Sequence, residues 1–170
     1  AFDSFNYPHL CEAGVNFTFD EHRILVPDYS KPLVTHTQLD NNVIIFSLFP
    51  GMEEGLMHHL FDAPELRSIV MRSYGSGNAP QRPWLMKLLK QASERGVIVV
   101  NISQCISGQV EMSRYDTGYQ LKDAGVISGY DSTVEAAVTK LMYLQARYKD
   151  ADKVRYYMNH SIAGEITIQE

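Results

Sequence analysis

The chain has 170 residues, of which 45% are hydrophobic and 21% are charged, and its formal net charge is −5. This length and composition are typical of one globular domain with a short additional segment. The net charge is negative and no lysine or arginine residues cluster, so the chain lacks the basic patch that nucleic-acid-binding proteins carry.

No apolar run approaches the roughly 20 residues that a membrane-spanning helix needs, so we expect no membrane partner. Residues 1–4 lack the basic and apolar regions of a signal peptide. The two cysteines, Cys11 and Cys105, form no CxxC pair and are compatible with a reducing cytosol. Because the sequence begins with alanine and not methionine, we expect a fragment or a processed product.

Residues 1–40 are predicted to form a linker and an edge hairpin. The segment 15–19 alternates apolar and polar residues, as an exposed strand does. Pro8, Pro27 and Pro32 interrupt the remainder. We expect the main domain to cover residues 41–170.

Three apolar runs predict strands at 43–47, 69–72 and 97–101, each covered on both faces as in a parallel sheet. Helical patterns follow these runs, first over 51–61 and then from Pro83, with Gly96 suited to a helix end. This alternation of strands and helices predicts an α/β fold. We expect a three-layer, flavodoxin- or Rossmann-like half with a parallel sheet of about four strands flanked by helices.

The C-terminal part is predicted to be helical. Ser132 and Glu135 have the spacing of a capping box. Apolar residues then keep helical spacing to about Tyr148, and a shorter helix is expected over 152–159.

Ligands of open α/β sheets bind beyond the carboxyl ends of the strands. This rule selects three loops rich in small polar residues, 49–51, 72–78 and 101–105. Such loops suit a carboxylate or an amide better than an apolar ligand. Gly75 and Gly77 lack the third glycine and the following acidic residue of a dinucleotide site, so we expect no nucleotide cofactor and read them as turn residues.

A metal site is not predicted either. His58 and His59 are adjacent and face different directions on a helix, and Glu54 with His58 is read as a solvated surface pair. Cys105 has no histidine near it in the sequence, so we interpret it as inert packing in preference to a nucleophile.

Three blocks of the sequence resemble bacterial-type cytoplasmic (type I) L-asparaginases. The first is Arg-Ser-Tyr-Gly-Ser-Gly-Asn-Ala-Pro-Gln at 72–81, and the second runs over 99–108 as Val-Val-Asn-Ile-Ser-Gln-Cys-Ile-Ser-Gly. The third is Asp-Ala-Gly-Val-Ile-Ser-Gly at 123–129, followed by Thr-Val-Glu-Ala at 133–136. Residues 1–5 and 10–14 also look like the segment that enters the C-terminal domain of that family.

The resemblance implies an enzyme that hydrolyses L-asparagine to L-aspartate and ammonia, in the cytoplasm and as a homo-oligomer, a dimer or a tetramer. It places the catalytic threonines, aspartate and lysine in an N-terminal domain before Ala1. No catalytic residue is therefore expected in this chain, and the isolated chain is predicted to be inactive. The C-terminal domain is expected to support subunit assembly.

The resemblance also implies two sites in this chain. Asn78 matches an asparagine that reaches the neighbouring subunit's active site, although it could instead cap a helix beginning near Pro80. Arg72, Ser103 and Cys105 match residues of a regulatory asparagine site found in some members. Arg72 could bind the ligand carboxylate or form a salt bridge at a subunit interface.

Two other functions fit this sequence. One is the asparaginase-related subunit of a tRNA-dependent amidotransferase, and the other is a non-catalytic ligand-binding module of the same fold. The amidotransferase subunit would need an extra N-terminal domain, and the type I loop signatures argue against it. Both threonine motifs in the sequence upstream of Ala1 would exclude the binding module.

Overall fold

The computed structural model describes residues 5–112 and 116–168, and its contacts divide the chain into two units, Ala1–Thr37 and Gln38–Glu170. The first unit contains an antiparallel hairpin of β1 (Cys11–Ala13) and β2 (Phe17–Phe19), in which Cys11 pairs with Phe19. The expected strand at 15–19 is thus shorter than predicted. Val15 is fully exposed in the turn, where backbone bonding between Gly14 and Asn16 closes the chain on itself.

The second unit is built on a parallel sheet with the strand order β3-β4-β5-β6. These strands are β3 (Val43–Ser47), β4 (Ser68–Ser73), β5 (Ile98–Ser103) and β6 (Ile127–Ser128). The three predicted strands are confirmed to within two residues at each end, and β6 is the fourth. Because the order follows the chain without reversal, these four strands create no topological switch point.

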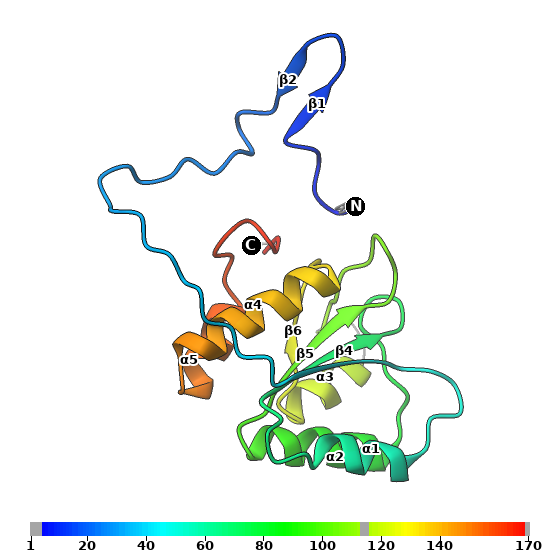
Figure 1. Ribbon diagram of the computed structural model, residues 1–170. Helices are drawn as coiled ribbons and strands as arrows, with labels where there is room; N and C mark the ends of the chain where they lie inside the picture. The colour runs from blue at the N-terminus through cyan, green and yellow to red at the C-terminus, as the bar shows by residue number, and fades with distance from the viewer. Residues whose placement is uncertain (1–4, 113–115, 169–170) are drawn as a thin grey trace. The chain divides into compact units, whose positions relative to one another are not determined.

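Helices cover both faces of the sheet, which confirms the three-layer α/β prediction (Figure 1). The crossover helices α1 (Glu54–Phe61), α2 (Pro83–Glu94) and α3 (Asp116–Asp123) pack on one face. The helices α4 (Val134–Arg147) and α5 (Ala151–Met158) pack on the other. Successive parallel strands with right-handed crossovers place their connecting helices on the same face, as observed here.

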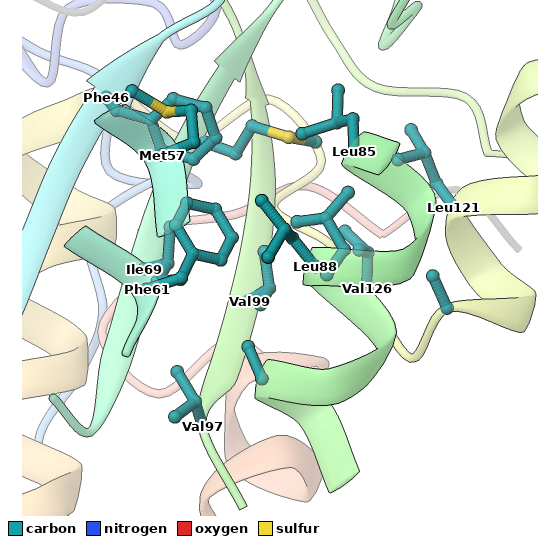
Figure 2. Close-up of a cluster of buried hydrophobic side chains, with 14 of the residues drawn as sticks. Phe46, Met57, Phe61, Ile69, Leu85, Leu88, Val97, Val99, Leu121 and Val126 are labelled. Carbon is teal, nitrogen blue, oxygen red and sulfur yellow. The ribbon is translucent and has the colours of Figure 1, made fainter. Parts of the chain in front are cut away.

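Two apolar clusters hold these layers together. Figure 2 shows the first, in which Leu85 and Leu88 of α2 meet Phe46, Ile69 and Val99 of the sheet. Leu88 is only 2% exposed, so its apolar surface contributes nearly its full burial energy, about 2 kcal/mol. The second cluster joins the opposite face of β4 and β5 to α4 and α5.

The start of α4 corrects the predicted capping box, and the end of α2 confirms the predicted role of Gly96. The N-cap of α4 is Thr133, whose hydroxyl accepts from the Ala136 N–H at 3.2 Å, and it is not Ser132. Ser132 instead donates its hydroxyl to Gly129 O at 2.7 Å. Gly96 has φ +87° directly after α2, a conformation that favours glycine, as the predicted helix end requires.

A buried ion pair attaches the C-terminal segment to α4. Lys140, whose side chain is 3% exposed, pairs with Glu165 and also donates to His160 O at 2.6 Å. Glu165 in turn accepts from the backbone N–H groups of Ile162 and Ala163. The segment after α5 is therefore fixed by charge-assisted hydrogen bonds.

Candidate functional site

Three loops meet at the carboxyl edge of the sheet, and one side chain joins them. The Gln104 amide, just after β5, donates to Leu48 O at 2.7 Å and to Arg72 O at 2.8 Å. The Leu48 N–H bonds the same Arg72 carbonyl at 2.9 Å, and the Gln104 N–H bonds Ser73 O. The loops after β3, β4 and β5 are therefore held as one hydrogen-bonded edge.

The glycine loop after β4 is a tight turn. Tyr74 and Asn78 exchange backbone hydrogen bonds of 2.9 and 2.8 Å, and Gly75 and Gly77 have φ of +50° and +107°. A Cβ at Gly77 would lie 2.8 Å from a methyl group of Val110, so a side chain would be crowded there as well as strained. The predicted role of these glycines as turn residues is confirmed.

Two side chains of β5 donate hydrogen bonds to the backbone of this turn. The Asn101 amide, which is fully buried, donates to Gly77 O at 3.0 Å, while its own Oδ1 has no hydrogen-bond partner. The Ser103 hydroxyl donates to Gly75 O at 2.6 Å. Both carbonyls of the loop are thus held by the neighbouring strand.

Asn78 does not cap a helix, so that alternative is wrong. The helix α2 begins at Pro83, its N-cap is Arg82, and no side chain caps it, because Pro80 and Pro83 delay the first turn. The Asn78 side chain instead accepts a hydrogen bond on Oδ1 from the Thr117 hydroxyl at 2.9 Å. Asn78 is half-buried at the end of the glycine loop.

Arg72 lies on β4 with its guanidinium half-buried. Nη1 donates to the Ser47 hydroxyl at 3.4 Å, whereas Nε is buried and unpartnered. Within the described parts of the chain, Arg72 forms no ion pair. A buried guanidinium N–H without an acceptor is costly to the fold.

Ser103 and Cys105 lie together at the end of β5. The Ser103 hydroxyl accepts from the Cys105 N–H at 3.0 Å while it donates to the glycine loop, so it has only acceptor capacity left. The Cys105 thiol is exposed. The packing part of our interpretation of Cys105 is therefore wrong, because this residue follows the strand by two positions and leaves the core. That Cys105 is not a nucleophile stays a prediction.

The strand register separates the two halves of the predicted regulatory site. Arg72 pairs with Ile102, whose side chain packs toward α4, whereas Ser103 pairs with Ser73 one position further. Because side chains alternate between faces of a sheet, Arg72 and Ser103 point to opposite faces. One ligand would not bridge them within a single chain.

Sequence reasoning assigned no role to Gln104, Asn101 or Thr117. Asn101 interrupts an apolar run at a position that proves fully buried, which is the signal that could have found it. Thr117 offers no such signal, since it lies 39 residues from Asn78 in a segment without a distinctive pattern.

The described residues form neither a metal-binding cluster nor a helix that could span a membrane. Residues 5–112 and 116–168 hold no group of three or more His, Cys, Asp or Glu side chains arranged to bind a metal ion. Glu54 and His58 form an exposed pair at 3.3 Å, as expected for a surface contact. Over the same residues, every helix is too short or too polar to cross a bilayer.

The parallel sheet, the helices on its two faces and the hydrogen-bonded loop edge define a three-layer α/β domain. Residues 42–158 match the Glutaminase/Asparaginase C-terminal domain family. The chain therefore belongs to this family.

Similar proteins include asparaginases and a subunit of an amidotransferase. The chain is 38% identical to L-asparaginase 1 of Escherichia coli over 98% of its own length and 49% of that protein. The crystal structure of L-asparaginase I from Vibrio cholerae matches 99% of the chain and 50% of its own, with a TM-score of 0.89 and 38% identity. A glutamyl-tRNA(Gln) amidotransferase subunit of Sulfolobus acidocaldarius is 32% identical over 98% of the chain and 37% of its own length. The chain thus spans about half the length of each of these two asparaginases.

Proposed function

We propose that this chain is the C-terminal half of a cytoplasmic L-asparaginase that hydrolyses L-asparagine to L-aspartate and ammonia. The observation that carries this proposal is the match to an asparaginase I structure along 99% of the chain with a TM-score of 0.89. By the resemblance, the activated nucleophile and its acid–base partners come from the other half of the enzyme.

Asn78 is proposed to complete the active site of a neighbouring subunit. Asn101 and Ser103 donate hydrogen bonds to two carbonyl groups of its loop. These bonds fix the backbone that carries the Asn78 side chain. Such preorganisation is what a substrate-binding group needs. In the full-length protein, Asn78→Ala should lower kcat/KM for asparagine at least tenfold, whereas Gln81→Ala, an exposed residue nearby, should leave it unchanged. Equal rates for Asn78→Ala and wild type would reject this role.

Arg72, Ser103 and Cys105 are proposed to contribute to a regulatory asparagine site between subunits. Among the described residues no carboxylate pairs with the half-buried Arg72, and Cys105 is exposed, and both observations support this proposal. Because Arg72 and Ser103 face opposite sides of the sheet, Arg72 of one subunit would share a ligand with residues of another.

Calorimetric titration of asparagine into the full-length protein tests the regulatory site. Arg72→Ala should weaken one class of sites by one to two decades, because a charge-assisted hydrogen bond contributes roughly 1.5–3 kcal/mol. Arg82→Ala, an exposed arginine at the start of α2, is the matched control. Equal binding by wild type and Arg72→Ala would remove Arg72 from the site.

A homo-oligomer, dimer or tetramer, is part of this proposal, since both sites need a second subunit. Sedimentation equilibrium of the full-length protein measures it, and a monomer at assay concentration would reject both shared sites. Cell fractionation tests the cytoplasmic location.

A second candidate function is the ammonia-producing subunit of a tRNA-dependent amidotransferase. The 32% identity to the Sulfolobus protein over 98% of the chain favours it. Ammonia release that requires a partner protein and glutamyl-tRNA would support this candidate, whereas release from free asparagine by the purified protein alone supports the asparaginase. A protein that binds asparagine without releasing ammonia under either condition would be a non-catalytic binding module.

A further inference from the structure

The first turn of α3 contacts the glycine loop through one side-chain hydrogen bond. Thr117 Oγ1 donates to Asn78 Oδ1 at 2.9 Å, across 39 residues of sequence. The bond is half-buried, so water competes for it only in part. Gly118, the next residue, packs so closely against Met112 that a Cβ there would overlap the Met112 carbonyl oxygen. The backbone that carries Thr117 therefore lies close to Met112.

This bond gives the two ends of the Asn78 amide different surroundings, because Oδ1 faces the Thr117 hydroxyl and Nδ2 faces away from it. An asparagine side chain offers a carbonyl oxygen that accepts and an NH₂ group that donates. With Oδ1 held toward the Thr117 hydroxyl, the NH₂ group at Nδ2 lies at the other end of the amide and keeps both of its hydrogens for a ligand. Among residues 5–112 and 116–168, no acceptor binds Nδ2. The amide is thereby oriented as a donor.

We propose that Thr117 is a positioning residue that fixes the Asn78 amide so that its NH₂ group faces an oxygen of the substrate. This inference rests on the proposed role of Asn78 in the neighbouring active site. The ligand atom it would meet is a carboxylate or carbonyl oxygen, and not an ammonium group, which would require the opposite amide orientation. Thr117 itself touches no substrate in this scheme.

A double-mutant cycle in the full-length protein tests the positioning role, with ammonia release from L-asparagine resolved into kcat and KM. Thr117→Val keeps the shape and removes the hydroxyl, so kcat/KM should fall roughly 2- to 12-fold, the range for one neutral hydrogen bond. Thr117→Ser restores the hydroxyl and should recover most of this loss. In an Asn78→Ala background, Thr117→Val should have no further effect.

The controls separate positioning from structure. Thr139→Val removes a hydroxyl that bonds its own helix in α4 and should leave kcat/KM unchanged. If Thr117→Val lowers activity equally with and without the Asn78 amide, its role is structural and the proposal fails. If Asn78→Ala is impaired but Thr117→Val matches wild type, the positioning role alone fails. If Asn78→Ala matches wild type, the proposed function of Asn78 fails first.

Asn78→Asp tests the orientation of the amide. The aspartate keeps an acceptor for Thr117 but has no N–H to donate. Its kcat/KM should be at least as low as that of Asn78→Ala, because a second carboxylate would repel the substrate's oxygen. Near-wild-type activity of Asn78→Asp would show that the acceptor end faces the ligand and would overturn the inference.

Discussion

The buried ion pair between Lys140 and Glu165 gives a stability prediction that depends on which partner is removed. The Lys140 side chain is 3% exposed and that of Glu165 is 13% exposed. Glu165→Gln leaves the more buried cation with His160 O and a neutral amide as acceptors. Breaking a buried pair costs about 3–5 kcal/mol, and since these acceptors remain we expect about 2–3 kcal/mol.

Removing the cation should be less costly. Lys140→Met keeps the volume of the side chain, and the Glu165 carboxylate that remains still accepts from the N–H groups of Ile162 and Ala163 and reaches some water. We expect a loss of about 1–2 kcal/mol. The variant with both substitutions should be more stable than Glu165→Gln alone, because it leaves no buried cation without its counterion.

Urea unfolding of the 170-residue chain measures these differences. Trp84 is the one tryptophan in the sequence and packs against the core around α2, so its fluorescence reports the unfolding of the second unit. The reasoning predicts the order wild type, Lys140→Met, Glu165→Gln from most to least stable. A Glu165→Gln midpoint equal to that of wild type, or a double variant less stable than Glu165→Gln, would refute it.

Three further predictions concern pH, the core and the glycine loop. Burial by itself would raise the pKa of Glu165, but the hydrogen bonds from Lys140 and the backbone outweigh it and hold that pKa below its ordinary value. The carboxylate therefore stabilises the fold above its unfolded pKa of about 4.3 and loses this effect as the pH falls through the lower folded pKa. Unfolding midpoints recorded from neutral pH downward should fall less steeply in Glu165→Gln than in wild type, and parallel curves would contradict this. In the core, Leu88→Ala should lose about 2–5 kcal/mol, whereas Leu56→Ala, whose side chain is 62% exposed, should lose under about 1 kcal/mol by the same assay. In the loop, Gly77→Ala should be less stable than Gly75→Ala by about 1 kcal/mol or more, since both have positive φ but only Gly77 faces a side chain within 4 Å; similar midpoints would show that the loop adapts.

The sequence predicted the central layers of the fold well for a physical reason. Uninterrupted apolar runs leave a strand no polar face to expose, so β3, β4 and β5 could be placed from composition alone. The helix α3 and the strand β6 were not predicted. The helix is eight residues long and buries only Gly118 and Leu121, and the strand has only two residues. Neither is long enough for the spacing of its apolar residues to indicate a helix or a strand.

The candidate site could be predicted only in part. Its position at the carboxyl edge of the sheet follows from the parallel arrangement, and the roles suggested for Arg72, Ser103 and Asn78 came from a resemblance. The opposite facing of Arg72 and Ser103 depends on the pairing of β4 with β5, which no local pattern fixes. The bond from Thr117 to Asn78 joins segments whose meeting depends on the packing of α3.

Ammonia release from L-asparagine tests the central claim most directly, measured in parallel for the full-length protein and for the purified 170-residue chain. The account predicts release by the full-length protein and none above background by the chain, because an amide is hydrolysed only where an activated nucleophile lies beside its base. Release by the isolated chain that is lost on mutating a residue within it would contradict the account, and so would a full-length protein that releases no ammonia.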